Sequence, residues 1–219
     1  MAKLTVKKAD LDASTSKDKV VVRHRCYNVT IKGTAPLLFN RMLLKGEGQN
    51  KGAVVIKEDP IEKEWRIWRE KLHTSDAGVI IPGVNLQMSI FSGAQYWGQR
   101  IPGAGQKTYS DLIKSGCIVE DMPISITDIE DERIEPFGTY CTGNVSKGSR
   151  GGKVWKIRPR INVWGGSFLF HVYDDRLTED VLRTIITYAG VYRAVGDWRP
   201  RYGRYSLESL VEVESVNYI

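Results

Sequence analysis

The sequence predicts an α+β fold, in which strands with one buried face alternate with amphipathic helices. Three observations carry this prediction. Apolar and polar residues alternate over 27–31 and again over 168–172, as they do in half-buried strands. Apolar residues recur at helical spacing over 84–97. The stretch 177–213 has the pattern of a second amphipathic helix, a loop with glycine and arginine, and a final strand.

A chain of 219 residues is long enough to bury one sizeable core. Residues 1–19 are polar and are expected to be disordered. No internal repeat and no linker divides the remainder. Residues 20–219 are therefore expected to form a single domain, with insertions at about 41–75 and 98–160.

The composition favours a soluble protein with an acidic partner. The net charge is +6, a moderate basic excess. Cys26, Cys117 and Cys141 are far apart and odd in number, which fits neither a disulfide framework nor a metal-binding pair and suits a reducing cytosol. No apolar run approaches the roughly 18 residues that span a membrane, and the N-terminus lacks the apolar core of a signal peptide. We therefore expect a cytoplasmic protein without membrane association.

The first predicted helix follows a mobile basic loop at 41–57. Asp59 is placed to cap it and Pro60 to occupy its first turn. Its apolar face is expected to be a core stripe made of Ile61, Trp65, Trp68 and Leu72.

A short strand at 79–81 and a Pro82–Gly83 corner precede the helix at 84–97. Free N–H groups and the positive dipole end at such a corner attract phosphate. An ordinary strand-to-helix turn is the favoured interpretation.

An acidic cluster lies in the strand-rich middle of the chain. Clustered carboxylates can hold Mg²⁺ or Ca²⁺, but the spacing here matches no dedicated metal loop, so no metal or other cofactor is expected. A solvated acidic edge, or one that faces a basic surface of a neighbouring subunit, is favoured. The cluster consists of Asp128, Glu130, Asp131, Glu132 and Glu135.

Residues 145–160, the basic arm, carry six basic residues and no acid, with three glycines in the first half. The pattern predicts a flexible loop or hairpin that would repel itself unless it met an anion. Trp155 lies between the charges, so a base could stack on it while its neighbours bind phosphates. The alternative is a solvated hairpin whose Trp packs inward. Nucleic-acid contact is favoured.

The loop at 196–204 joins the last helix to the last strand. Glycine lets backbone N–H groups approach an anion, while arginine supplies charge and planar stacking. Together with the basic arm and the basic loop at 41–57, it provides the candidate nucleic-acid-binding residues. These are Arg41, Lys45, Lys51, Lys147, Arg150, Lys153, Trp155, Lys156, Arg158, Arg160, Trp198, Arg199, Arg201, Tyr202 and Arg204.

The predicted order of elements is that of a ferredoxin-like or RRM-like domain, with a glycine-rich loop before the last strand and a thumb-like basic hairpin as an insertion. Three segments resemble the repeat-associated (RAMP) superfamily of CRISPR systems. NVTIKGTAPLLFNR is similar to its first strand and following turn, and VIIPGVNLQMSIFSGA to its strand, corner and helix. YAGVYRAVGDWRPRYGRYSLESL is similar to its helix, glycine-rich loop and final strand.

Within that superfamily the sequence most resembles the Cas7-type backbone subunits, which include solitary Cas7-like proteins of phage genomes. The resemblance implies binding of single-stranded RNA or DNA and head-to-tail homo-oligomers, as in a helical filament, with other CRISPR-like or phage subunits as further partners. Two departures stand out. Residues 85–88 lack the basic residue that the family carries there, and the last loop has only Gly196 and Gly203.

The sequence favours binding over cleavage, and no catalytic residue is assigned. Cleavage of RNA by acid–base chemistry needs a proton-transfer group near the 2′-OH or the leaving oxygen. His24, His73 and His171 are each interpreted as ordinary polar or half-buried residues. A Cas6-like metal-independent endoribonuclease remains the first alternative. The second is a structural adaptor that self-assembles by docking the basic arm on a neighbour's acidic cluster. RNA and DNA are not distinguished, because backbone contacts and stacking serve both.

Overall fold

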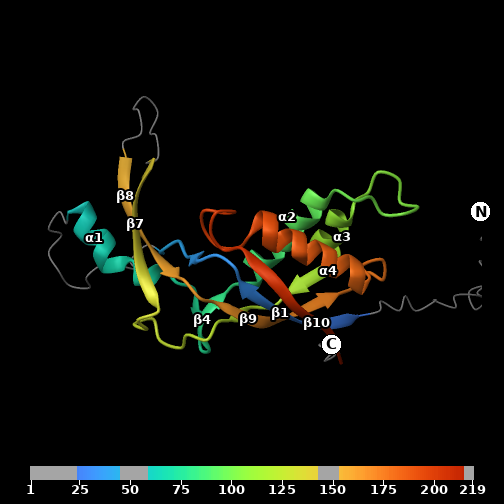
Figure 1. The fold of residues 1–219 in the computed structure, drawn as a ribbon, viewed down its shortest axis with the longest axis horizontal. Coiled ribbons are helices and arrows are strands. Elements are labelled where there is room, and N and C mark those ends of the chain that lie inside the picture. The colour runs from blue at the N-terminus through green and yellow to red at the C-terminus, as the bar shows by residue number, and fades with distance from the viewer. Residues whose placement is uncertain (1–23, 45–58, 143–152, 215–219) are drawn as a thin grey trace, which may run out of the picture.

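The computed structural model describes residues 24–44, 59–142 and 153–214 (Figure 1). The expected disordered segment 1–19 and most of the loop at 41–57 lie outside the described residues.

The central sheet is antiparallel and has the strand order β10-β1-β9-β5. Its strands are β1 (Arg25–Gly33), β5 (Cys117–Val119), β9 (Gly165–Val172) and β10 (Tyr205–Val213). With helices in the crossovers from β1 to β5 and from β9 to β10, this is the ferredoxin-like arrangement. The predicted fold class is therefore confirmed.

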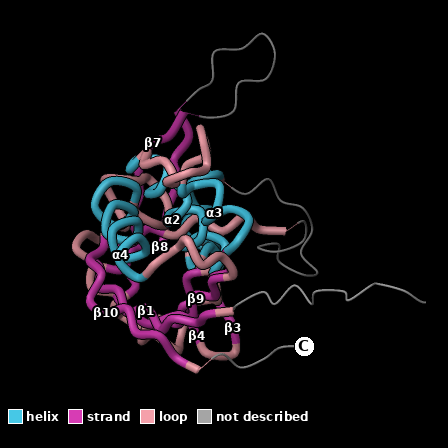
Figure 2. Tube along the Cα trace, turned by 90° about the vertical axis from the view of Figure 1, so that its right-hand side faces the viewer, coloured by secondary structure: helices cyan, strands magenta, loops and turns pink. Residues whose placement is uncertain are grey.

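Helices cover one face of this sheet (Figures 1 and 2). They are α2 (Gly83–Trp97), α3 (Tyr109–Gly116) and α4 (Glu179–Tyr188), and α4 continues into the π-helical turn η2 (Ala189–Arg193). The alternation in β1 buries Tyr27, Val29 and Ile31. The helical spacing in α4 buries Leu182, Ile185 and Ile186 completely. The apolar faces of β1 and α4 pack together in one core, as the sequence predicts.

A second sheet, in the order β2-β8-β7, extends away from the helices. It consists of β2 (Leu37–Leu38), β7 (Ile134–Thr142) and β8 (Lys153–Ile161). Strands β7 and β8 form a long antiparallel hairpin that stands out from the body of the molecule (Figure 1). Residues 153–160 of the basic arm thus belong to the second strand of this hairpin, and residues 143–152 lie outside the described part.

A third, small sheet has the order β3-β4-β6, from β3 (Thr74–Ser75), β4 (Gly78–Ile81) and β6 (Met122–Pro123). Strand β5 lies inside the stretch 98–160, which was expected to be an insertion, yet it is an edge strand of the central sheet. The division into one domain with two insertions stays a prediction.

The helix predicted from Pro60 is shorter than expected, and its buried face differs. Helix α1 (Pro60–Ile67) is capped by Asp59, as predicted, and is followed by the 3₁₀ turn η1 (Arg69–Lys71). The predicted core stripe is confirmed at Trp68 and Leu72, which are buried, and wrong at Ile61 and Trp65, which are 45% and 51% exposed. The side that packs against β8 buries Glu64 and Ile67 instead, since Glu64 finds cationic partners there.

Candidate nucleic-acid interface

The loop that leads from η2 back to β10 folds tightly on itself. At Gly203 the backbone has φ +72°, and a Cβ atom would lie 1.7 Å from the Val195 carbonyl oxygen. The Gly203 carbonyl accepts a hydrogen bond from the Val195 N–H at 3.0 Å. Its N–H donates to the Pro36 carbonyl at 2.8 Å, so the loop is also tied to the segment after β1. Only glycine fits this position.

Arg158 joins the hairpin to this loop. Its Nε donates a hydrogen bond to the Asp197 carboxylate, and its Nη1 donates to Cys141 Sγ at 3.4 Å. The guanidinium lies 5.0 Å from the centre of the Trp198 ring. Burial opposes the charge, but the hydrogen bond to Asp197 prevails and raises the pKa of Arg158. Only 8% of the Arg158 side chain is exposed. The residue therefore has a structural role, which is to hold β8 against the loop before β10.

Three aromatic rings form a surface between hairpin and loop. The Phe137 ring of β7 lies 5.9 Å from Trp198 and 5.5 Å from Tyr202, measured between centroids. The Trp198 and Tyr202 rings are 6.3 Å apart. Trp198 remains 37% exposed. The fold thus brings Trp198 and Tyr202, both predicted from the sequence, together with a third ring, Phe137, which lies 61 and 65 residues before them.

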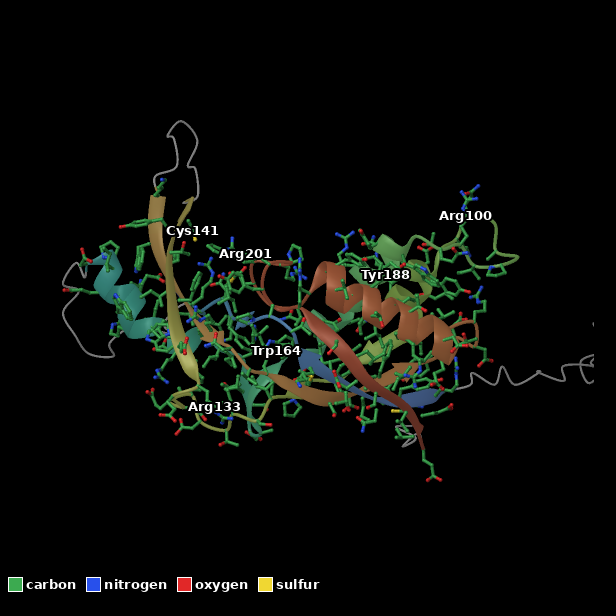
Figure 3. All side chains as sticks on the ribbon, in the orientation of Figure 1. Arg100, Arg133, Cys141, Trp164, Tyr188 and Arg201 are labelled. Atoms are coloured by element: carbon green, nitrogen blue, oxygen red, sulfur yellow. The ribbon has the colours of Figure 1, made fainter. Side chains whose placement is uncertain are left out.

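Exposed arginines border this aromatic surface. Arg204 Nε donates to the Pro200 carbonyl at 2.8 Å and thereby supports the loop. Arg199 and Arg201 are exposed, and neither forms an ion pair within the described part of the chain. Figure 3 shows Arg201 in the region between the hairpin and the helices. Two cations without a local counter-charge are suited to bind phosphate.

The second strand of the basic arm is neutralised by acids from distant segments, which corrects the expectation that it lacks counter-charges. Lys156 pairs with Glu64 of α1 at 2.7 Å. Arg158 pairs with Asp197, and Arg160 with Glu135. These acids lie 92, 39 and 25 residues away along the chain, so no local charge count could include them.

Glu64 is the centre of the most buried of these contacts. It accepts hydrogen bonds from Lys71 Nζ at 2.5 Å, Lys156 Nζ at 2.7 Å and the Ile157 N–H at 3.0 Å. Burial raises the pKa of Glu64, but the hydrogen bonds from Lys156 and Lys71 outweigh it, and the net direction is downward. Burial lowers the pKa of Lys71. The cluster fixes the hairpin to α1.

The remaining candidates of the basic arm have other surroundings. Lys153 is exposed at the start of β8. Trp155 is half-buried, meets the Tyr140 ring edge-on at 4.9 Å and covers Gly138, where a Cβ would lie 2.3 Å from the indole. Its buried Nε1 has no hydrogen-bond partner in the described residues. This arrangement matches the inward-packing alternative. The candidates outside the described residues are Lys45, Lys51, Lys147 and Arg150.

Arg41, the remaining candidate, has a structural role. Its Nε donates to the carbonyls of Glu70 and Leu72, each at 3.1 Å. These bonds hold the segment after β2 against η1.

The N-terminus of α2 is occupied by the protein itself. The Gly83 N–H donates to Asp121 Oδ1 at 2.7 Å. A carboxylate at this position satisfies the donor that a phosphate would use. The ordinary-turn interpretation therefore describes this corner.

Three members of the acidic cluster form ion pairs with arginines of this chain. Asp131 pairs with Arg133 at 2.6 Å, and Glu130 with Arg69 at 3.4 Å. Glu135 pairs with Arg160 in the hairpin. Among residues 24–44, 59–142 and 153–214, no three metal-ligating side chains are grouped as a metal site requires. The cysteines Cys26 and Cys117 are buried thiols.

Two of the three histidines form a chain that sequence reasoning missed. His24 Nε2 and His171 Nδ1 are 3.0 Å apart, and His171 Nε2 lies 2.8 Å from Glu120 Oε1. The His24 ring also stacks on Tyr173, with 4.8 Å between centroids. No sequence signal links residues that are 147 positions apart. His73 lies elsewhere, beside Phe39.

No protein-family model and no curated protein matches the sequence. In the described part of the chain, every helix is too short or too polar to cross a membrane.

Two solved structures are similar in fold. One is the cryo-EM structure of the Type III-B Cmr-beta bound to cognate target RNA, with 15% identity, a TM-score of 0.43, and 88% of this chain and 61% of that chain covered. The other is the crystal structure of Cmr6 from Pyrococcus furiosus, with 11% identity, a TM-score of 0.44, and 85% of this chain and 100% of that chain covered. The present chain thus spans about three fifths of the length of the first structure.

Proposed function

We propose that the protein binds single-stranded nucleic acid, without cleaving it, on the face formed by the loop at 196–204 and the hairpin β7–β8. One observation carries the proposal: the exposed Trp198 ring and the half-buried Tyr202 ring lie beside Arg199 and Arg201, which have no acidic partner in the described residues. Stacking needs the open faces of bases, so a single strand fits this surface better than a duplex.

The two kinds of side chain have separate roles in this proposal. Arg199 and Arg201 neutralise phosphates, which makes affinity depend on salt. Trp198 stacks on a base, and such contacts are worth about 1–3 kcal/mol each. Arg158 beneath Trp198 and the backbone bonds of Gly203 hold the ring in place before the strand arrives. The proposal includes head-to-tail assembly along the strand, as in the Cas7-type subunits that the sequence resembles.

Fluorescence anisotropy with labelled oligonucleotides of increasing length tests the proposal. Wild type is expected to bind at low salt, more tightly as the strand lengthens. Trp198→Ala should weaken binding by about 5- to 150-fold, the equivalent of one base stack. Trp65→Ala is the matched control, because Trp65 is an exposed tryptophan on α1. The proposal fails if wild type does not bind, or if the two variants weaken binding equally.

A second candidate function, metal-independent RNA cleavage, is favoured by the chain Glu120–His171–His24. A carboxylate that accepts a hydrogen bond from one imidazole, which contacts a second, is suited to proton transfer. His24 directly precedes β1, and His171 pairs with Cys26 near the start of that strand, whereas the proposed binding face lies past its other end, about 30 Å away by strand length. The test of this candidate is to incubate RNA in EDTA with wild type and with His24→Ala. RNA that stays intact with wild type excludes cleavage as the function.

A further inference from the structure

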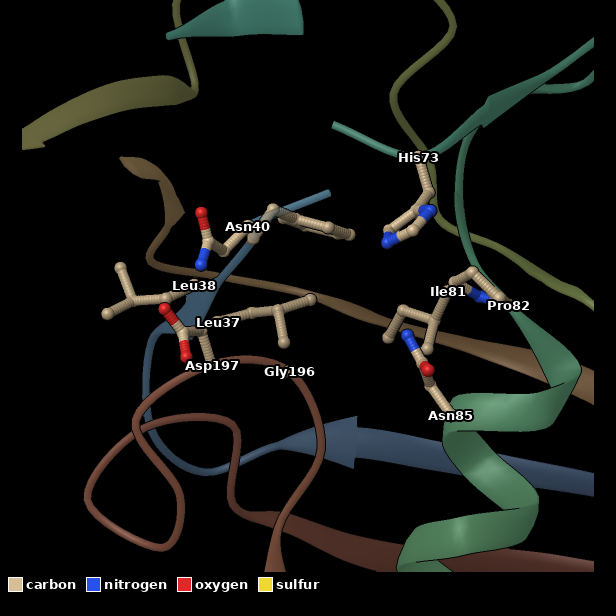
Figure 4. A pocket seen from close by; sticks show the side chains of 10 residues that line it. Leu37, Leu38, Asn40, His73, Ile81, Pro82, Asn85, Gly196 and Asp197 are labelled. Atoms are coloured by element: carbon tan, nitrogen blue, oxygen red, sulfur yellow. The ribbon is translucent and has the colours of Figure 1, made fainter. Parts of the chain in front are cut away.

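A cavity of about 140 Å³ opens beside the proposed binding face (Figure 4). Four segments that are far apart in the sequence line it: 37–40, His73, 81–85 and 196–197. They belong to the segment around β2, the turn between η1 and β3, the corner between β4 and α2, and the loop before β10. No single stretch of sequence predicts this site.

Backbone contacts hold the walls of the cavity in place. Gly196 has φ +84°, and a Cβ there would lie 2.6 Å from the Leu38 carbonyl oxygen, so glycine lets the loop close against β2. The Asp197 N–H then donates to that carbonyl at 2.9 Å. On the other side, the Ile80 N–H donates to the His73 carbonyl at 2.9 Å. The site is therefore formed before any ligand binds.

Polar side chains with unused hydrogen-bonding groups surround an apolar floor. Figure 4 shows His73 and Asn85 reaching from two sides toward the same space, with Leu37 and Ile81 beside it. In the described part of the chain, the side chains of His73, Asn85 and Asn40 make no hydrogen bond. An amide offers both donors and acceptors, and a neutral imidazole offers one of each. These groups are available to a ligand.

The charge of the cavity favours a neutral ligand. Burial lowers the pKa of His73, and the neighbouring Arg41 lowers it further, so the imidazole is neutral near pH 7. Asp197, the one carboxylate among the described lining residues, is paired with Arg158. No lysine or arginine is among the described residues that line the cavity. Arg41 is near His73, but its Nε is bound to the carbonyls of Glu70 and Leu72 and it does not line the cavity. The described wall therefore offers no cation to a phosphate, whereas a neutral ring with a polar edge would find partners there.

The size of the cavity suits a ligand with one ring system. A cavity of roughly 150 Å³ takes a benzene-sized ring, while sites for larger ligands run from about 300 Å³ upward. The site also lies next to the proposed face, because Asp197 directly precedes Trp198 in the loop. A strand on that face would pass the mouth of the cavity.

We propose that this cavity binds one unstacked nucleobase of the bound strand, with His73 and Asn85 forming hydrogen bonds to its edge. The inference rests on the proposed function and adds a base-reading site to it. Stacking alone tolerates every base, whereas hydrogen bonds to a base edge distinguish among them. The protein should therefore prefer one base over the others.

Anisotropy with four homopolymeric ribo-oligonucleotides of equal length measures this preference. Wild type should bind one of them about tenfold more tightly than the weakest. His73→Phe keeps a ring without the polar edge, and Asn85→Leu keeps the size without the amide, so each should reduce the preference to about twofold. The slope of affinity against salt should stay that of wild type, because no phosphate-binding residue is changed.

Gln95→Leu is the matched control, since Gln95 is an exposed amide on the same helix as Asn85. Near-ultraviolet circular dichroism checks the fold of each variant. Asn40→Leu changes a further amide of the lining at an exposed position, so it tests the base preference without disturbing the core. Equal affinity of wild type for all four strands, or a preference that survives in the variants, overturns the base pocket while strand binding stands. No binding of any strand by wild type at low salt overturns the proposed function as well.

Discussion

Substitution of Glu64 by glutamine should destabilise the protein by about 3–5 kcal/mol. Glu64 is 4% exposed and accepts three hydrogen bonds, two of them from lysines. Gln retains an acceptor for the Ile157 N–H but removes the charge that balances Lys71, whose side chain is 7% exposed. An uncompensated buried cation accounts for most of the loss. The pair with Lys156, which is 44% exposed, adds at most about 1 kcal/mol.

Urea unfolding followed by tryptophan fluorescence measures this loss. Lys71→Met in the Glu64→Gln background removes the buried cation and should bring the free energy of unfolding back to within about 2 kcal/mol of wild type. Glu62→Gln, an exposed position on the same helix, is the control and should stay within about 0.5 kcal/mol. A Glu64→Gln variant that loses less than about 1 kcal/mol, or a double variant no more stable than the single one, would refute the reasoning.

Two further predictions concern the loop and the cavity. Gly203→Ala should destabilise the protein by about 2 kcal/mol or more beyond the effect of Gly103→Ala. Both glycines have positive φ, but only at position 203 would the added Cβ clash with backbone. Equal urea midpoints for the two variants would contradict this. Because burial lowers the pKa of His73 in the folded state, the unfolded chain takes up its proton first, and stability should fall as pH drops below about 6.5. His73→Phe should show a smaller fall between about pH 7.5 and 5 in parallel urea titrations, and an unchanged fall would count against this account.

The sequence predicts the central domain well because local periodicity determines it. The alternation in β1 and the helical spacing in α4 each place their own apolar side in the core, and the cap at Asp59 follows from the residue type. These features depend on neighbours within a few residues. They therefore need no knowledge of tertiary contacts.

The ion pairs of the hairpin and the cavity could not be predicted from the sequence. Glu64 lies in a run of charged residues and gives no sign that it is buried, and its contact with Lys156 spans 92 residues. The pair of Arg158 with Asp197 also joins residues far apart in the sequence and could not be predicted for the same reason. His73 and Asn85 face one cavity only because separate turns meet there. Long-range partners decide which charges are free to bind a ligand.

The salt dependence of strand binding tests the central claim most directly. For single strands, the slope of log affinity against log salt becomes shallower by about 0.7 for each phosphate that the protein no longer neutralises. The double variant Arg199→Ala/Arg201→Ala should therefore bind with a slope shallower by about 1.4 than wild type. Arg100→Ala/Lys107→Ala removes two exposed cations from the loop that follows α2, at the far end of the molecule from the hairpin (Figure 3), and should keep the wild-type slope. A wild-type slope in the Arg199→Ala/Arg201→Ala variant would contradict a strand-binding face at this loop.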